Sequence, residues 1–183
     1  MSEISSNFRN LQDVVIRHSE ADEWYSAVNE WVIIDVEEDR TLTKSCICGK
    51  EKLHYLFTIR NKLNGNILYP LGSSCIRRFE RNDLNEEVNL KVQLFELLHA
   101  IQHNDFIILS SDYFSRKLLK YLYDLGAFIG SEYNNYDPFR DYQFMVDMFN
   151  KRMRTQGQEK MATAIIMNSI RPFLWRMLRD KIR

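Results

Sequence analysis

The sequence predicts an α+β fold with N-terminal helices, a small antiparallel sheet built on one β-hairpin, and a C-terminal helical bundle. Residues 31–36 and 53–69 are rich in β-branched and aromatic residues, whereas the chain after residue 82 repeats apolar residues at helical spacing. Strands therefore precede helices instead of alternating with them, which argues against a parallel α/β sheet. With 183 residues, 45% of them hydrophobic, the chain is long enough to bury a core.

The N-terminal module is expected to span residues 1–82 and to begin with two helices. Residues 7–17 place Phe8 and Leu11 at the i, i+3 spacing of one helix face. Ser19 has acidic residues directly after it, which is typical of a helix start, and this second helix is expected to run to about residue 29.

A β-hairpin is the clearest strand pattern in the chain. Residues 31–36 predict a first strand, and residues 53–60 predict the strand that enters the hairpin. Asn64 and Gly65 predict a tight turn with both residues in the left-handed conformation, and the chain should return through residues 67–69.

Residues 83–183 predict four helices that pack on the N-terminal module in one compact domain. The expected helices cover residues 85–103, 112–128, 138 to about 150, and 158 to the C-terminus. Pro172 lies inside the last of these and is expected to kink or break it, because proline lacks the N–H that a helix interior requires.

The net charge is zero, but the charges are segregated along the chain. Residues 46–81 carry 7 basic and 2 acidic side chains, and residues 151–183 carry 9 and 2, whereas the two remaining segments are acidic. A basic face is the usual electrostatic feature of a nucleic-acid-binding protein. The alternative is that the blocks neutralise one another across the fold.

All three cysteines flank the predicted hairpin. Cys46 and Cys48 precede it in a C-x-C-G motif, and Cys75 follows it at the entry to a short helix. Thiolates at a glycine turn, together with one at the return of a hairpin, are typical of small structural zinc sites. Zinc takes four ligands, and His54 is the histidine nearest in the sequence, so it is the candidate fourth ligand. The alternative is a cluster of free cysteines that pack as small hydrophobic side chains.

Basic and aromatic residues alternate around the hairpin and recur in the last helix. Basic side chains can contact phosphates, and exposed aromatic rings can stack on unpaired bases. The candidate nucleic-acid-binding residues are Arg60, Lys62, Arg77, Arg78, Arg81, Arg176 and Arg179. A solvated basic surface is the alternative.

The histidines supply the candidates for catalysis. His99 and His103 lie one turn apart in the expected helix 85–103, and His54 precedes the second strand. A histidine with an ordinary pKa could remove a proton from an RNA 2′-hydroxyl group. No recognisable catalytic motif surrounds these residues, so the structural alternative is that His99 and His103 form a polar edge of an amphipathic helix.

The cysteine region also resembles known sequences. The segments Ser45–Lys50, Thr58–Asn66 and Leu71–Phe79 contain C-x-C-G, I-x-N and G-x-x-C-I-x-x-F motifs that resemble uncharacterised proteins of phages and mobile elements. Residues 114–122 and 141–152 are similar to segments in proteins of Firmicutes mobile elements.

The length and this mobile-element character resemble type II-A anti-CRISPR proteins of streptococci. The resemblance implies a phage-derived inhibitor that binds a type II CRISPR effector ribonucleoprotein and displaces or truncates its guide RNA. The alternatives are an accessory nucleic-acid-binding zinc module of a mobile element and a histidine-dependent RNA-cleaving protein.

The expected location is the cytoplasm of a bacterial host cell. An odd number of cysteines favours a reducing compartment, and the first residues lack the basic and apolar pattern of a secretory signal. No apolar run is long enough to predict a membrane span or a membrane partner.

Overall fold

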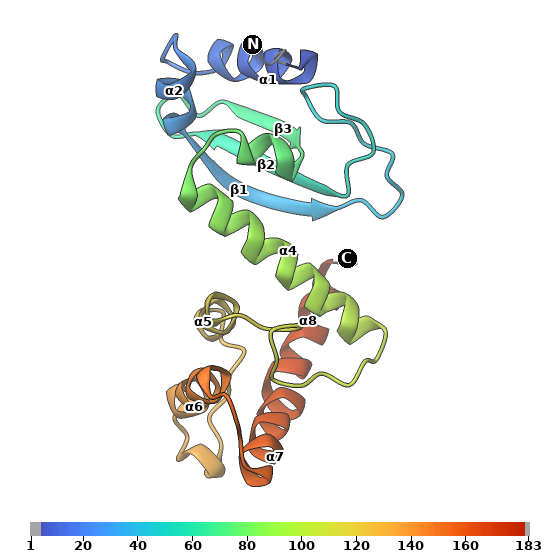
Figure 1. The fold of residues 1–183 in the computed structure, drawn as a ribbon, viewed down its shortest axis with the longest axis vertical. Helices are drawn as coiled ribbons and strands as arrows, with labels where there is room; N and C mark the ends of the chain where they lie inside the picture. The colour runs from blue at the N-terminus through green and yellow to red at the C-terminus, as the bar shows by residue number, and fades with distance from the viewer. Residues whose placement is uncertain (1–4, 182–183) are drawn as a thin grey trace. The chain divides into compact units, whose positions relative to one another are not determined.

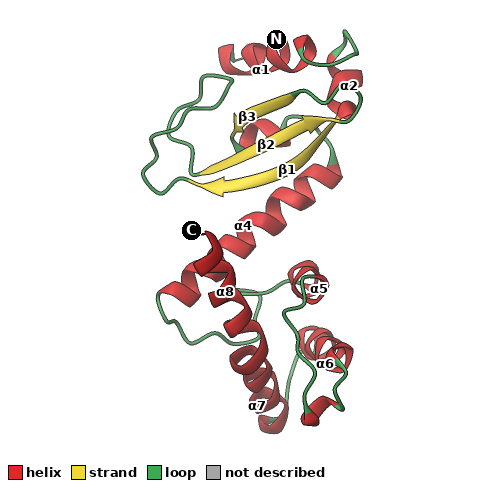
Figure 2. Ribbon diagram, turned by 180° about the vertical axis from the view of Figure 1, so that it is seen from behind, coloured by secondary structure: helices red, strands yellow, loops and turns green. Residues whose placement is uncertain are grey.

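The computed structural model describes residues 5–181 (Figure 1). The fold is α+β, as predicted. The chain forms two compact units, Met1–Lys91 (unit 1) and Val92–Arg183 (unit 2), and the division falls inside one helix. In Figure 2, where strands are yellow, the sheet belongs entirely to unit 1, and unit 2 is helical.

Unit 1 contains the sheet and short helices around it. Its elements are α1 (Ser6–Arg17), α2 (Trp24–Ala27), the 3₁₀-helix η1 (Val28–Glu30), β1 (Trp31–Glu38), β2 (Tyr55–Asn61), β3 (Ile67–Leu71) and α3 (Ser73–Arg77). The long helix α4 (Asn82–Gln102) begins in unit 1 and ends in unit 2. The expected second helix is shorter than predicted, because only α2 and the adjoining η1 are helical there.

The sheet is antiparallel with the strand order β1-β2-β3, so the predicted hairpin is confirmed. Trp31 lies opposite Asn61 in the β1–β2 pair, and Phe57 lies opposite Leu71 in the β2–β3 pair. The turn differs from the prediction. Of Asn64 and Gly65, only Gly65 has a positive φ, of +78°. Two backbone hydrogen bonds of Asn61 close a longer loop: its N–H donates to the Asn66 carbonyl at 2.8 Å, and its carbonyl accepts from the Gly65 N–H at 3.0 Å.

Aromatic rings hold α1 and α2 on the rest of unit 1. Phe8 and Trp24 make an edge-to-face contact with their ring centroids 5.5 Å apart, and Trp24 makes another with Phe79 at 5.4 Å. The sheet contributes fully buried side chains to the same unit, among them Trp31 and Phe57.

Glu30 is a buried carboxylate that joins the N-terminal segment to the hairpin. It accepts hydrogen bonds from the backbone N–H groups of Glu20 and Ala21, each at 2.8 Å, and from the side chain of Asn61 at 2.5 Å. Burial alone would raise the Glu30 pKa, but these three hydrogen bonds outweigh it and hold the pKa below its ordinary value.

Unit 2 is helical, and the side chains of Ser115, Asp137 and Thr155 cap the starts of three of its helices. Its elements are α5 (Arg116–Asp124), the 3₁₀-helix η2 (Glu132–Asn134), α6 (Pro138–Asn150), α7 (Gln156–Ile165), the π-helical segment η3 (Ile166–Ile170) and α8 (Arg171–Lys181). The helix expected over residues 112–128 is therefore shorter at both ends. The Ser115 hydroxyl caps its start by accepting from the Leu118 N–H at 3.1 Å, and Gly126 follows its end with a φ of +80°.

Pro172 does not break the last helix. The chain passes from α7 through η3 into α8 without leaving the helical conformation, and Pro172 is the second residue of α8. A π turn is wider than an α turn, so it gives the proline ring the space that a regular helix would deny it. The proline is thus accommodated by a local widening directly before it.

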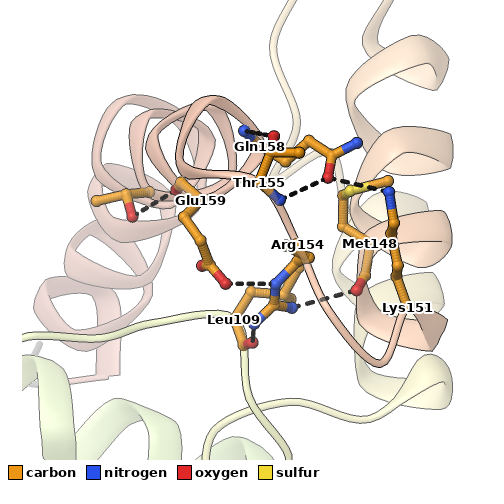
Figure 3. A network of polar contacts seen from close by, with 8 residues as sticks. Leu109, Met148, Lys151, Arg154, Thr155, Gln158 and Glu159 are labelled. Atoms are coloured by element: carbon orange, nitrogen blue, oxygen red, sulfur yellow. Dashed lines mark hydrogen bonds and ion pairs between the residues drawn. The ribbon is translucent and has the colours of Figure 1, made fainter.

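The Arg154 guanidinium links three parts of unit 2 (Figure 3). It donates to the backbone carbonyls of Leu109 at 2.9 Å and Met148 at 3.2 Å, and it pairs with Glu159 at 2.6 Å. Thr155 begins α7 in the same network through a capping box with Gln158. Arg154 belongs to the basic C-terminal block, but its charge is used inside the fold.

We expect Glu30→Gln to destabilise the protein by about 1–3 kcal/mol near pH 7. The glutamine amide has one acceptor oxygen, whereas the two carboxylate oxygens of Glu30 accept three hydrogen bonds. The folded Glu30 pKa lies below its ordinary value of 4.5, so the contribution of the carboxylate is complete above that pH and is lost as the pH falls through the folded pKa. Urea unfolding between pH 7 and pH 3 should show that the difference in the free energy of unfolding between the wild type and Glu30→Gln decreases below about pH 4.5. The exposed Glu23→Gln variant is the control, and an advantage independent of pH would contradict the assignment.

We expect Arg154→Ala to lower the free energy of unfolding by about 2–3 kcal/mol, because the Leu109 carbonyl loses its side-chain donor, the Met148 carbonyl loses one of its two donors, and Glu159 loses its ion-pair partner. Lys151→Ala is the control, since this exposed side chain makes one hydrogen bond, to Gln158 at 3.1 Å, and should change stability by about 0.5 kcal/mol or less. Urea unfolding of the full chain measures both. Equal effects of the two substitutions would show that Arg154 is not a structural link.

Candidate metal centre and an arginine-rich groove

The connection between β1 and β2 carries two of the cysteines and has no regular secondary structure. Its first half is organised by Asp39, whose carboxylate accepts from Thr41, Thr43 and Lys44 backbone N–H groups at 2.9–3.1 Å. The Thr41 hydroxyl also donates to this carboxylate, and that hydrogen bond is the main reason why the Asp39 pKa lies well below its ordinary value.

The second half of the connection folds into a loop around Cys46 and Cys48. The Cys46 N–H donates to the Lys50 carbonyl at 2.7 Å, and the Gly49 N–H donates back to the Cys46 carbonyl at 2.8 Å. Gly49 has a φ of +93°, a conformation that glycine adopts without a steric cost. The loop is held from outside by Asn10 of α1, which donates to the Cys48 carbonyl at 3.3 Å.

Cys75 completes the cluster from α3. Its Sγ lies 3.4 Å from the Sγ of Cys46 and 3.2 Å from the Sγ of Cys48, and all three sulfurs lie within 4.8 Å of one another. The three thiols are free and buried. We call Cys46, Cys48 and Cys75 the thiol centre; its sulfurs are close enough to bind one metal ion.

The three thiols are electrostatically inequivalent. A hydrogen bond with Cys75, aided by the backbone at Cys48 and Gly72, lowers the Cys46 pKa in spite of burial. Burial raises the Cys48 pKa, and the contact with Cys46 together with burial raises the Cys75 pKa. The neighbours of Cys46 therefore favour its thiolate form over those of Cys48 and Cys75, and binding of a metal would require all three thiols to lose their protons.

The structure does not place His54 in the thiol centre. Its Nε2 lies 2.7 Å from a carboxylate oxygen of Glu38 at the end of β1, and its ring lies against the Tyr55 ring with the centroids 4.6 Å apart. The imidazole is half-exposed and is already engaged by β1 and β2. The fourth ligand expected from the sequence is therefore not brought to the three sulfurs.

A cavity of about 180 Å³ opens beside the thiol centre, between α1 and the start of α3. Cys48 and Cys75 form part of its wall, so two of the three sulfur ligands belong to residues that line it. The other polar side chains of its wall are Ser5, Asn7, Lys50, Ser74 and Arg78. We call this space the cationic cavity, since Lys50 and Arg78 are its charged residues.

The predicted nucleic-acid-binding residues of unit 1 have different surroundings. Arg81 is largely buried and donates to the backbone carbonyls of Val28 at 3.0 Å and Trp31 at 2.6 Å, so its guanidinium is a structural link and not an available phosphate contact. Arg77 is exposed and donates to Asn89 at 2.7 Å.

The three remaining cations of this set are exposed, and Arg78 is the one of them that lines the cationic cavity. Arg78 lies over the Phe8 ring at 4.9 Å from its centroid. Arg60 and Lys62 are exposed at the end of β2 and in the hairpin loop.

The predicted residues of unit 2 lie in a groove. Arg176 and Arg179 line an open groove of about 500 Å³ along α8. One face of α8 presents residues at the spacing i, i+4 and i+8, namely Arg171, Trp175 and Arg179. The groove is completed by Met167 and Pro172, and we call these six residues the α8 groove.

Trp175 is the residue that the sequence analysis missed. Its side chain is 40% exposed, whereas Trp24 and Trp31 are buried, so it is the solvent-accessible tryptophan of the chain. The guanidinium of Arg171 is fixed beside it by hydrogen bonds to the Asp105 carbonyl at 3.1 Å and to the Asn104 side chain at 2.5 Å. The signal in the sequence was a tryptophan four residues from an arginine on either side.

The candidate catalytic histidines are divided between the two units. His54 belongs to unit 1, whereas His99 and His103 belong to unit 2, near the end of α4 and just after it. In the described part of the chain, the thiol centre is the one group of three or more cysteine, histidine or acidic side chains arranged to hold a metal. RNA cleavage by histidines stays a prediction.

The chain matches no protein-family model, no curated protein and no solved structure. The phage origin, the CRISPR effector as partner and the cytoplasmic location therefore stay predictions. Across residues 5–181, no helix has the length and apolar character that a membrane crossing requires.

Proposed function

We propose that this protein binds single-stranded RNA through the α8 groove and that a structural zinc ion in the thiol centre stabilises unit 1. The observation that carries the RNA proposal is the exposed Trp175 between Arg171 and Arg179 on one helix face. An aromatic ring that stacks on a base, flanked by cations that contact phosphates, is the usual arrangement in proteins that bind single strands.

The spacing within the groove suits an extended strand. Positions i, i+4 and i+8 of a helix are separated by about 6 Å each, which is close to the distance between successive phosphates of an extended single strand. The Arg176 guanidinium lies 5.8 Å from the Phe173 ring centroid, which restrains a further cation at the same helix. A double helix offers no unpaired base to Trp175, so the groove favours single strands.

Zinc is the metal that the thiol centre favours. Three thiolates form a soft, anionic donor set, and zinc prefers such a set in small structural sites. Without a metal, the cysteine loop is held by a few backbone hydrogen bonds, so a zinc ion would join the β1–β2 connection to α3. None of the described residues that line the adjoining cavity is acidic, so the cavity offers no carboxylate base for metal-assisted hydrolysis.

The resemblance to type II-A anti-CRISPR proteins suggests which RNA the α8 groove would bind. A guide RNA, free and bound to a type II CRISPR effector, is the ligand that this resemblance implies. Binding of unrelated single strands with equal affinity would favour the accessory nucleic-acid-binding module instead.

The zinc proposal predicts about one equivalent of zinc in protein purified without chelators. Cys46→Ser and Cys75→Ser should each lose the metal and lower stability by several kcal/mol, since structural zinc contributes about 10–16 kcal/mol in small domains. His54→Ala is the control and should retain zinc, because the structure pairs this residue with Glu38. Metal analysis and thiol titration measure the result. Metal-free protein with three freely titrating thiols, even after growth with added zinc, would contradict the proposal.

The RNA proposal predicts that Trp175→Ala weakens the binding of a 20-nucleotide single strand by about 5- to 150-fold, which corresponds to the loss of one stacked base. Arg176→Gln with Arg179→Gln should weaken binding and reduce the slope of log K against log salt by about 0.7 for each lost phosphate contact. Fluorescence anisotropy measures the affinity, and quenching of tryptophan fluorescence reports Trp175 because the other two tryptophans are buried.

The matched control is Arg60→Gln with Lys62→Gln, which removes two exposed cations of unit 1. This pair should leave the affinity nearly unchanged. If it weakens binding and the α8 variants do not, the RNA-binding surface is in unit 1. If neither pair nor Trp175→Ala changes affinity or salt dependence, the protein does not bind RNA through these residues.

A further inference from the structure

The thiol centre supplies three ligands, and its metal needs a fourth. A closed structural zinc site takes all four ligands from the protein, whereas a site with three protein ligands leaves one position to an exogenous group. Among the residues that the structure describes, no histidine, aspartate or glutamate joins the three sulfurs. His54, the candidate from the sequence, is engaged by Glu38. The open position must therefore be filled from the solvent side.

The cationic cavity is where that position can be reached. Cys48 and Cys75 are in its wall, and the cavity volume of about 180 Å³ corresponds to several water molecules, at about 30 Å³ each. A single metal-bound water would leave most of the space empty. The cavity is large enough for a tetrahedral oxyanion, and Asn7, Phe8 and Leu11 of α1 form one side of it.

The charges of the cavity favour an anion. A divalent metal with three thiolates carries a net charge of −1, and Lys50 and Arg78 reverse this to +1. Lys50 Nζ is held 3.1 Å from the Ser74 hydroxyl, and the Arg78 guanidinium lies over the Phe8 ring. None of the described residues of the wall is acidic. A doubly charged group would therefore meet two cations and the metal without a carboxylate to oppose it.

We infer that the cationic cavity binds a phosphate monoester, with one phosphate oxygen on the metal of the thiol centre and the others on Lys50 and Arg78. Three acceptor oxygens on one phosphorus match one metal ion and two cationic donors, whereas a carboxylate has too few oxygens to reach all three. This inference rests on the proposed metal. The monoester could belong to a free nucleotide or to the 5′ end of a nucleic-acid strand, and these sources share the same chemistry.

The experiment uses the full chain with Co²⁺ in place of zinc, because the visible absorption of Co²⁺ changes when one of its ligands is exchanged. Inorganic phosphate and a nucleoside 5′-monophosphate should each change the spectrum saturably, whereas the nucleoside without phosphate should not. A 5′-phosphorylated oligonucleotide and its 5′-hydroxyl counterpart then separate the sources. If only the free nucleotide acts, the ligand is a small molecule, and if the phosphorylated strand also acts, it is a strand end.

Lys50→Met and Arg78→Met should each weaken phosphate binding by about tenfold or more while one equivalent of Co²⁺ is retained. The control is Lys44→Met, which removes an exposed cation of the same connection that is not in the cavity wall. Metal content is measured separately in every variant. This separation keeps a failure of the metal site distinct from a failure of the phosphate site.

Three results would overturn the inference. If the protein binds one equivalent of metal but phosphate at up to about 10 mM leaves the spectrum unchanged, the fourth position is closed to phosphate and the zinc proposal stands. If Lys50→Met and Arg78→Met weaken the binding of the metal and leave that of phosphate unchanged, the two cations only balance the charge of the thiolates. If no metal binds at all, both proposals fall.

Discussion

The contact between Cys75 and the two cysteines of the β1–β2 connection is the constraint on which unit 1 depends. The connection from Asp39 to His54 lacks regular secondary structure, so the conformation of its backbone is not fixed by a ladder of hydrogen bonds. Asp39 orders the first half by accepting hydrogen bonds, and the three sulfurs fix the second half to α3. Because α1 is joined to the same loop through Asn10, one small cluster connects the first helix, the sheet and the helix that follows it.

The cationic cavity lies directly beside this cluster, since Cys48 and Cys75 are in its wall. The cysteine loop contacts α1 through the hydrogen bond from Asn10 to the Cys48 carbonyl, and the cavity beside this contact is lined by the polar side chains of Asn7, Lys50 and Ser74. Filling this space with apolar side chains would have given a denser core. A polar cavity beside three thiols is more consistent with a ligand site than with a packing defect.

The arginine side chains of this protein have two different roles. Arg81 and Arg154 each donate to two backbone carbonyls and pair with a neighbouring acid, so their charges stabilise loops and helix ends. Arg176 and Arg179 remain exposed beside Trp175. The charge segregation along the sequence is real, but part of each basic block is used within the fold. Counting charges in a segment therefore overestimates the surface that is available to a partner.

The sequence by itself determined the α+β class, the hairpin, the neighbourhood of the three cysteines and the C-terminal helices. These features depend on local patterns, namely apolar spacing, β-branched runs and short-range cysteine placement, which act within a few residues. Even here, the helix expected over residues 112–128 was too long, because the Ser115 cap and Gly126 set its ends.

Only the tertiary structure decided which polar side chains are available. His54 was a reasonable fourth ligand from its position, but the end of β1 brings Glu38 to it. Arg81 was a reasonable phosphate contact, but the carbonyls of Val28 and Trp31, some fifty residues earlier, capture its guanidinium. The cavity beside Cys48 depends in the same way on α1, far away in sequence. The physical reason is that a side chain's partner is set by which distant elements pack beside it, and no local pattern encodes that.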